Sequence, residues 1–370
     1  MRIAFAALLL AHGLIHLLGP AKAFGVADVS QLRQPITPFA GTLWLFASLL
    51  LVAAGIVVLR GDRWWWALAL PGALLSQALI STSWSDAKAG TLANIIIAVP
   101  LVLIAVDARP GSFRSQFRAT ATTLLTAPVR PAPLVGESDL AGLPELMQVY
   151  LRRSGAVGRP RVRNMRVAFS AQMRDNAEAP WMESTATQYE FFDPPARLFY
   201  MTASRSGVPF DVLHRYVGSD ATFQVRIASV YPMVDKAGPV LTKAETVTLM
   251  NDIVVMAPAA VLDLPFTWEQ RGPHRLQATF ANAGNTVSAT LEFDAAGDLI
   301  GFVSDDRTQE NASGSRSARW STPITGYATV DGIRIGTRGD ANWIEADGRE
   351  WTYGRFTIRE IAYNQSTFRP

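Results

Sequence analysis

The sequence of 370 residues contains no cysteine. This absence excludes disulfide bonds, thiolate nucleophiles, cysteine-ligated iron–sulfur clusters and cysteine-based zinc sites. It does not identify the cellular compartment, because a protein without disulfides can lie on either side of a membrane.

Charge is also scarce, at 18% of residues, whereas average soluble domains carry about a quarter. Residues 1–130 hold ten Lys and Arg but only four Asp and Glu, while residues 131–370 hold twenty-four and twenty-seven. The basic excess therefore lies beside the longest apolar runs, where a membrane surface explains it. We expect the lipid bilayer, and no nucleic acid, as a partner.

Familiar catalytic motifs are missing as well, including glycine-rich nucleotide loops, His-Glu-x-x-His and Gly-x-Ser-x-Gly. The C-terminal two thirds contain two histidines, His214 and His274, and nothing around them indicates a catalytic triad. Asp298 and the pair Asp305-Asp306 read as solvated loop charges. We predict neither a catalytic residue nor a metal site, and the sequence assigns no cofactor.

Four apolar stretches occupy the N-terminal part, and a spanning helix needs roughly 20 apolar residues. They predict a four-helix transmembrane bundle over residues 1–107, so that the chain crosses a membrane several times. The stretches are Ile3–Leu18, Gly41–Leu59, Trp64–Ser83 and Leu92–Val106.

Lys and Arg residues near the ends of these stretches predict the orientation, because cytoplasmic loops carry more of them. The majority side should be cytoplasmic, which places both termini and the C-terminal domain in the cytoplasm. That side carries Arg2, Arg60, Arg63, Arg109, Arg114 and Arg118, and the opposite side carries Lys22, Arg33 and Lys88.

Several polar side chains lie within or between these stretches, where they are costly and usually face the bundle interior. One interpretation is a polar pocket for a proton, a quinone headgroup, a haem or a metal, because imidazole suits all of these. The other is that they form hydrogen bonds between helices. The residues are His12, His16, Gln77, Asp86, Lys88 and Asn94.

Residues 108–136 read as a basic linker that contains several prolines, and residues 137–370 as an antiparallel β-rich soluble domain. From Met165 to Met173 apolar and polar residues alternate, which predicts a half-buried strand. Further candidate strands are Thr185–Phe192, Arg197–Ala203, Val212–Val217, Thr222–Val230, Phe266–Gln270, Arg275–Ala281, Thr286–Phe293, Leu299–Asp305, Arg319–Val330, Ile333–Trp343 and Trp351–Ala362.

One or two helices interrupt this pattern, the first over Leu140–Ser154. For the second, Thr242-Lys243-Ala244-Glu245 has the spacing of a capping box that begins a helix. Val247, Met250, Ile253 and Val254 then form an apolar stripe, and Pro258 ends it. The predicted fold is membrane α plus β: the transmembrane bundle followed by a curved antiparallel sheet, an open or half barrel.

Aromatic residues lie on nearly every candidate strand. A curved sheet lined by them can enclose an apolar ligand, although aromatic residues also dominate ordinary β-domain cores. The candidate ligand-lining residues are Tyr189, Phe191, Phe199, Tyr216, Trp268, Trp320 and Trp343.

Two resemblances rest on particular motifs. Residues 1–106, with His12-Gly13-Leu14-Ile15-His16, Trp64-Trp65-Trp66 and Ser83-Trp84-Ser85-Asp86-Ala87-Lys88, resemble an uncharacterised bacterial four-helix membrane family, which implies the bacterial inner membrane. Residues 137–363, with Leu143-Pro144, Tyr150-Leu151-Arg152-Arg153-Ser154-Gly155 and the stretch from Met250 to Trp268, are similar to a bacterial domain family of unknown function. Neither family implies an activity.

The β-rich part also resembles, more loosely, the LolA-like carriers of lipids and lipoproteins, which act outside the cytoplasm; fold analogy alone does not give function. The leading hypothesis is a membrane protein whose curved β-domain binds a lipid or another apolar small molecule. The alternative is a membrane redox or proton-handling protein that uses the helix face of His12 and His16 with haem or quinone.

Overall fold

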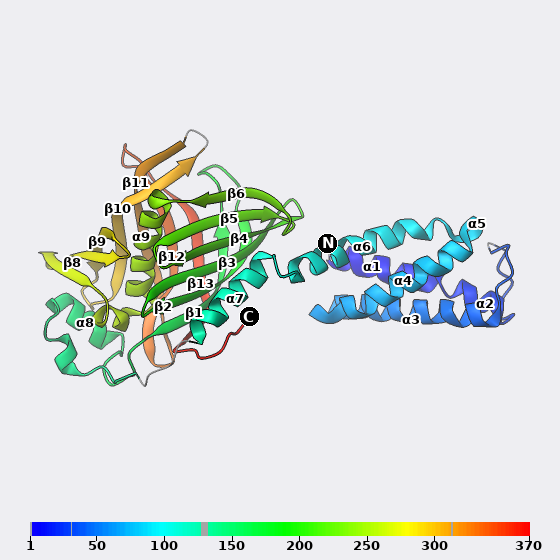
Figure 1. Cartoon of the computed structure of the whole chain (residues 1–370), viewed down its shortest axis with the longest axis horizontal. Coiled ribbons are helices and arrows are strands. Elements are labelled where there is room, and N and C mark those ends of the chain that lie inside the picture. Colours follow the sequence, from blue (N-terminus) through cyan, green and yellow to red (C-terminus); the bar gives the residue numbers. More distant parts are fainter. Residues whose placement is uncertain (1, 31, 127–131, 312–313) are drawn as a thin grey trace. The chain divides into compact units, whose positions relative to one another are not determined.

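A computed structural model describes residues 2–30, 32–126, 132–311 and 314–370. The chain divides into two compact units, residues 1–108 and residues 109–370. Figure 1 shows helices alone in the first unit and a large sheet with a few helices in the second.

The elements described in the first unit are all helices. Its elements are α1 (Arg2–Ile15), α2 (Leu18–Ala23), α3 (Pro38–Arg60), the 3₁₀ turn η1 (Arg63–Trp65), α4 (Trp66–Thr82), α5 (Trp84–Ala87) and α6 (Gly90–Ala108). Helix α1 packs on α3, α3 packs on α4, and α6 contacts both α4 and α1.

Small residues allow these helices to approach closely. A Cβ atom added at Gly13 of α1 would lie 2.9 Å from Cγ2 of Val52, and one at Gly55 of α3 would lie 2.8 Å from Cγ of Leu10. In a lipid environment apolar side chains gain little by leaving the tails, so close contact of this kind holds spanning helices together.

Within the described residues, three helical stretches are long and apolar enough to cross a membrane: Arg2–Ala23, Pro38–Arg60 and Gly90–Leu125. The remaining predicted span corresponds to α4, whose 17 residues include Pro71. That α4 and the three longer stretches cross a bilayer stays a prediction.

The second unit contains one antiparallel sheet of 13 strands, which confirms the predicted open, curved, antiparallel sheet. Two meanders, β1 to β6 and β7 to β13, join where β1 pairs with β13, and β6 and β7 form the edges. The strands are β1 (Asn164–Met173), β2 (Met182–Phe192), β3 (Pro195–Arg205), β4 (Val208–Val217), β5 (Asp220–Ile227), β6 (Tyr231–Ala237), β7 (Phe266–Gly272), β8 (Arg275–Asn282), β9 (Asn285–Phe293), β10 (Leu299–Asn311), β11 (Gly314–Val330), β12 (Ile333–Ile344) and β13 (Glu350–Tyr363).

The helix α9 (Pro239–Met256) and the 3₁₀ turn η3 (Pro258–Leu262) connect β6 to β7. Because these two strands are opposite edges of the sheet, the connection must cross one of its faces, and α9 packs on β5, β9, β10 and β12. Thirteen of the 18 residues of α9 are buried. Such burial on all sides is typical of a helix in the centre of a core.

The predicted capping box is wrong. Helix α9 begins at Pro239, about one turn before Thr242. The fixed φ angle of proline suits the first position of a helix. The Thr242 hydroxyl donates to the carbonyl of Gly238 and accepts from the backbone N–H of Ala221. Glu245 is therefore inside the helix. The predicted apolar stripe is buried, and the helix ends two residues before Pro258.

Two further helices complete the second unit: α7 (Phe113–Leu125) and α8 (Glu145–Arg153), with the 3₁₀ turn η2 (Glu137–Leu140) before α8. The segment predicted as a linker, 108–136, thus contains α7. Every fourth residue of α7 (Phe113, Phe117, Ala121 and Leu125) is buried against a cluster of sheet residues. These sheet residues belong to the face opposite α9, so both faces of β2 and β3 are covered.

Candidate functional site

A pocket of about 380 Å³ lies between α9 and the face of the sheet that this helix crosses. Most of its wall is apolar and comes from strands on both sides of the β1–β13 junction. The apolar lining residues include Phe169, Met173, Phe199, Met201, Val212, Phe223, Val255, Ile324, Phe356 and Ile358.

Three of the seven predicted lining aromatics, Phe199, Trp320 and Trp343, are in this wall. Tyr189 and Phe191 instead lie in the cluster under α7, on the opposite face of β2. The alternation of strand side chains puts them there, and the sequence did not indicate that a helix covers that face.

Tyr216 and Trp268 lie outside the pocket wall too. The Tyr216 hydroxyl bonds the Thr246 hydroxyl at 2.9 Å and accepts from Asn282 at 2.8 Å, so this ring belongs to the packed core beside α9. Trp268, on the edge strand β7, stacks on Phe266 with ring centroids 5.2 Å apart.

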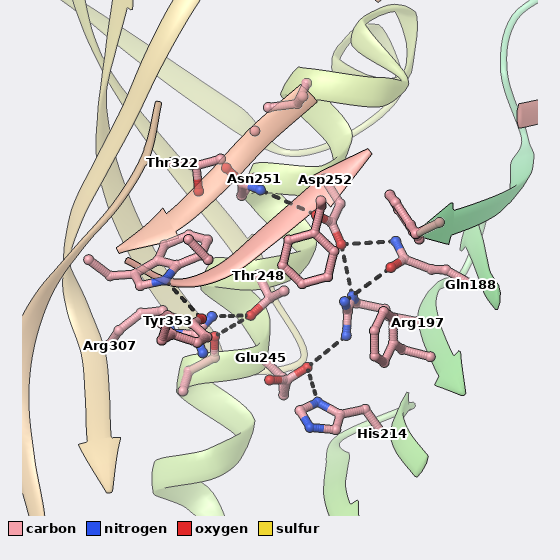
Figure 2. A pocket seen from close by; sticks show the side chains of 18 of the residues that line it. Gln188, Arg197, His214, Glu245, Thr248, Asn251, Asp252, Arg307, Thr322 and Tyr353 are labelled. Carbon is pink, nitrogen blue, oxygen red and sulfur yellow. Dashed lines mark hydrogen bonds and ion pairs between the residues drawn. The ribbon is translucent and has the colours of Figure 1, made fainter. Parts of the chain in front are cut away.

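A cluster of buried charges lies at one side of the pocket, around Arg197 (Figure 2). Its Nε donates to Oδ2 of Asp252 at 2.8 Å, and its Nη1 donates to Oε2 of Glu245 at 3.1 Å. Its Nη2 donates to Oε1 of Gln188 at 3.1 Å. Because Asp252 and Glu245 belong to α9 while Arg197 and Gln188 belong to β3 and β2, the cluster joins the helix to the sheet.

Glu190 extends this cluster. The Gln188 side-chain amide donates both to Glu190 Oε1 at 2.9 Å and to Asp252 Oδ2 at 3.0 Å. Burial raises the pKa of Glu190 well above its ordinary value, and the neighbouring Asp252 carboxylate adds to the effect. The site therefore favours the protonated form of Glu190 more than water does.

Glu245 shows the opposite behaviour. Burial works to raise its pKa, but His214, whose Nδ1 lies 3.4 Å from Oε2, and Arg197 outweigh it and hold the pKa below its usual range. The pKa values of these two carboxyl groups of one cluster therefore shift in opposite directions: the site favours the protonated form of Glu190 and the charged form of Glu245.

A second cationic side chain, Arg307 of β10, lines the pocket beside the tryptophans. Its guanidinium carbon lies 4.6 Å from the ring centroid of Trp320 and 5.8 Å from that of Trp343, and its Nη1 donates to the Thr248 hydroxyl. The Trp320 indole N–H in turn donates to the Tyr353 hydroxyl at 3.1 Å. The pocket thus combines an apolar wall with a few fixed polar groups, the usual composition of a small-molecule site.

The sequence prediction missed Arg197, Glu245, Asp252 and Arg307. One signal was available: Arg197 stands two positions before Phe199 in a strand and therefore faces the same side as a residue that was expected inside. The partners of such a residue come from α9, and strand alternation does not indicate them.

In the first unit, the structure brings His12, Asn94 and Gln77 together through Ser76, which the sequence analysis did not single out. His12 Nε2 lies 3.1 Å from the Ser76 hydroxyl and 3.0 Å from Asn94 Oδ1. The Asn94 amide donates to Gln77 Oε1 at 3.0 Å. His16 is adjacent, with its ring centroid 4.7 Å from that of His12.

Asp86 and Lys88 are not part of this cluster. Asp86 Oδ2 accepts from the backbone N–H groups of Arg33 and Gln34 at 2.6 and 2.8 Å, which lowers the pKa of the carboxyl and holds the segment before α3 near α5. Lys88 is exposed after α5.

The interpretation of Asp298 as a solvated loop charge is wrong. Its side chain is 8% exposed, and both carboxylate oxygens accept from Arg153 of α8 and from Arg334 of β12 at 2.6 to 3.0 Å. These hydrogen bonds lower the pKa of Asp298. Asp306 is half-buried and accepts from Lys243, whereas Asp305 is exposed.

Comparison with known proteins assigns the chain to a family without a known function. The sequence matches DUF6544, a family of unknown function, over residues 133–356, and the chain belongs to that family. This confirms the predicted resemblance to a domain family of unknown function. A search of curated proteins gives no match.

Two solved structures show partial similarity. A DUF1329 family protein from Desulfovibrio piger is 10% identical, with a TM-score of 0.34 over 59% of this chain and 92% of that one. A putative outer membrane lipoprotein-sorting protein domain from Vibrio parahaemolyticus is 7% identical, with a TM-score of 0.31 over 54% of this chain and 85% of that one.

Proposed function

We propose that this chain is a membrane-anchored binding protein, whose β-rich unit holds a lipid or another apolar small molecule between α9 and the sheet. The observation that carries the proposal is the pocket of about 380 Å³ with a largely apolar wall. Apolar cavities of this size with a few placed polar groups are the usual sites of small ligands.

The anchor in this proposal is the first unit, with α4 as a fourth span beside the three apolar stretches. Its 17 residues are at the lower end of the length that crosses a bilayer, roughly 17–25 residues. The excess of Lys and Arg on one side supports a cytoplasmic location for the second unit, in the inner membrane of a bacterium.

Photochemical crosslinking tests the ligand site. The full chain is reconstituted in phosphatidylcholine nanodiscs with palmitate that carries a diazirine in its acyl chain. After irradiation, we expect crosslinks on peptides from β3, β4 and α9. A Met201→Trp substitution fills the pocket and should remove these crosslinks.

Ser204→Trp is the matched control, because Ser204 is an exposed residue of the same strand and does not line the pocket. It should leave the crosslinks in place. Crosslinks confined to the helices of the first unit, or unaffected by Met201→Trp, would contradict the proposed site.

Single cysteine substitutions test the number of spans and the orientation, and the absence of native cysteine removes any background. With four spans and a cytoplasmic second unit, a membrane-impermeant maleimide should label Lys88→Cys in bacterial spheroplasts. It should label Arg63→Cys and Asp220→Cys only after lysis. Labelling of Asp220→Cys before lysis would show that the second unit lies outside the cytoplasm.

A second candidate function concerns the first unit, and one atom favours it. The His16 side chain is buried, its Nδ1 donates to the backbone carbonyl of His12 at 2.9 Å, and its Nε2 has no hydrogen-bond partner. With the proton on Nδ1, Nε2 is a free acceptor, which suits a quinol hydroxyl.

Among the described residues, no three His, Asp or Glu side chains gather as a metal site. His12 Nε2 is already engaged by Ser76 and Asn94, so His16 would act alone. Quinone analysis of the full chain, extracted in native membrane discs, tests this candidate. Quinone should co-purify with the wild type and be lost in His16→Leu; an equal quinone content in both would overturn it.

A further inference from the structure

We propose that the pocket takes an amphipathic ligand with an acyl chain and an anionic head, a carboxylate or a phosphate, and that Arg307 binds this head. The inference rests on the proposed ligand-binding function and names the ligand class of the same site. Two arginines that line the pocket, Arg197 and Arg307, differ in their hydrogen-bond partners.

Arg197 is already satisfied. Each of its three nitrogens has an oxygen partner, and two of those partners are the carboxyl groups of Asp252 and Glu245. Because carboxylates compensate its charge and all three of its nitrogens already donate, this guanidinium holds α9 on the sheet. It also contacts the Phe199 ring at 5.2 Å from the centroid, which closes one of its faces.

Arg307 is different. Among the described residues its hydrogen bond goes to a neutral hydroxyl, that of Thr248, and it forms no ion pair within 4 Å, although its charge helps to lower the pKa of Glu245. Its Nε is buried without any hydrogen-bond partner. A buried, charged donor without an acceptor costs free energy, and an anion that enters the pocket removes this cost.

The surroundings of Arg307 prepare it for a planar or tetrahedral anion. The stack on Trp320 fixes the plane of the guanidinium, so its N–H groups are held in one orientation. A fixed fork of donors binds carboxylate and phosphate oxygens better than a mobile ammonium group does.

The charges around the pocket agree with this assignment. Among the described lining residues, four are cationic (Arg197, Lys236, Arg307 and Arg338) and three are acidic (Glu245, Asp252 and Asp340). Arg338 and Lys236 are exposed, and together with the exposed Val240 they mark a side on which the pocket meets solvent. An anionic ligand therefore meets positive charge at the entrance and again at Arg307.

Two further polar atoms of the wall lack partners in the same way. The hydroxyl of Thr322 and Oδ1 of Asn251 are buried without a hydrogen-bond partner, although both residues line the pocket. Figure 2 draws both side chains on the side of the pocket away from His214. A ligand with hydroxyl or ester oxygens beyond its head would find partners there.

The test compares three diazirine probes on the full chain in phosphatidylcholine nanodiscs: the palmitate, its methyl ester and the corresponding lysophosphatidic acid. The measured quantity is the probe concentration that gives half-maximal crosslinking to α9 and β3 peptides. We expect at least one acid to bind the wild type about ten- to a hundredfold more tightly than the ester, the range of a charge-assisted hydrogen bond. The tighter acid identifies the head as carboxylate or phosphate.

In Arg307→Gln the acids should bind only as tightly as the ester. The matched control is Arg319→Gln on β11, an exposed arginine paired with Asp305 that does not line the pocket, and it should retain the preference for an acid. If acids and ester bind the wild type equally, the inference about Arg307 is overturned while the proposed function stands. If no probe crosslinks to these peptides, the inference about Arg307 and the proposed function are both contradicted.

Discussion

The Arg197 guanidinium of β3 and the Asp252 carboxylate of α9 form a buried ion pair, with Nε and Oδ2 2.8 Å apart. Their side chains are 8% and 10% exposed. This contact holds the crossing helix at a fixed place on the sheet, and the pocket exists only while the helix stays there. The stability of the site and of the second unit are therefore coupled.

Replacing Arg197 should strongly lower the free energy of unfolding. Arg197→Met removes the guanidinium that pairs with the buried carboxylates of Asp252 and Glu245, and breaking a buried pair on one side costs about 3–5 kcal/mol. The measurement is urea denaturation of the full chain in detergent, followed by the circular dichroism of the sheet. Arg205→Met is the control, because Arg205 is an exposed residue of the same strand with an exposed partner, Asp175. It should cost at most about 1 kcal/mol.

Glu190→Gln should raise the free energy of unfolding, whereas Arg197→Met lowers it. The pKa of the Glu190 carboxyl is higher in the folded state than in the unfolded state, so the folded state binds this proton more tightly. As the pH rises above the pKa of Glu190 in the unfolded chain, the unfolded chain loses the proton first and the folded state becomes less stable relative to it. The amide carries no proton to lose, so the free energy of unfolding of the variant should be higher than that of the wild type at pH 7. The advantage should disappear near pH 4, and a variant less stable than the wild type at pH 8 would refute this account.

Asp298→Asn should give a pH dependence in the acid range. The pKa of Asp298 is lowered by its hydrogen bonds to Arg153 and Arg334, so its contribution is complete above the unfolded value of 3.8 and declines as the pH falls below it. At pH 7 we expect a loss of about 2 kcal/mol in the free energy of unfolding, typical of hydrogen bonds to charged groups. The difference from the wild type should shrink below pH 4. Asp305→Asn, at an exposed pair with Arg319, should change little at any pH.

Helix α7 should behave as part of the folded sheet rather than as a tether. Phe117 is 3% exposed, with its ring centroid 5.7 Å from that of Tyr200 and 5.9 Å from that of Tyr189. Phe117→Ala should cost about 3–4 kcal/mol, as usual for a buried aromatic residue. It should also raise amide hydrogen exchange along α7. Thr122→Ala on the exposed side of the helix should do neither, and rapid exchange of α7 in the wild type would contradict the packing.

Most of the sheet was predictable because its strands alternate between buried and exposed positions, and this alternation is local in sequence. Twelve of the candidate strands correspond to observed ones, but β6 was missed. It contains Pro232 and is exposed along nearly its whole length, so it carries neither alternation nor an apolar face. Edge strands often have this composition, since it discourages pairing with other chains.

The site was less predictable than the fold for a physical reason. An apolar wall follows from apolar residues at regular spacing, but Glu245 and Asp252 become site residues only because α9 crosses the sheet. The helix crosses because β1 pairs with β13, which leaves β6 and β7 at opposite edges of the sheet. No local sequence pattern indicates this strand order. Likewise, the basic and threonine-rich composition of α7 suggested a solvated segment, although its four apolar positions are spaced for one buried face.

The pairing of β1 with β13 has a consequence for biosynthesis. A ribosome delivers β1 to β6 first and Glu350–Tyr363 only after every other strand, so the seam at the middle of the sheet stays open during most of translation. Throughout that interval the hydrogen-bonding edge of β1 is exposed to other nascent chains, and chaperones that shield it would be needed most at this stage.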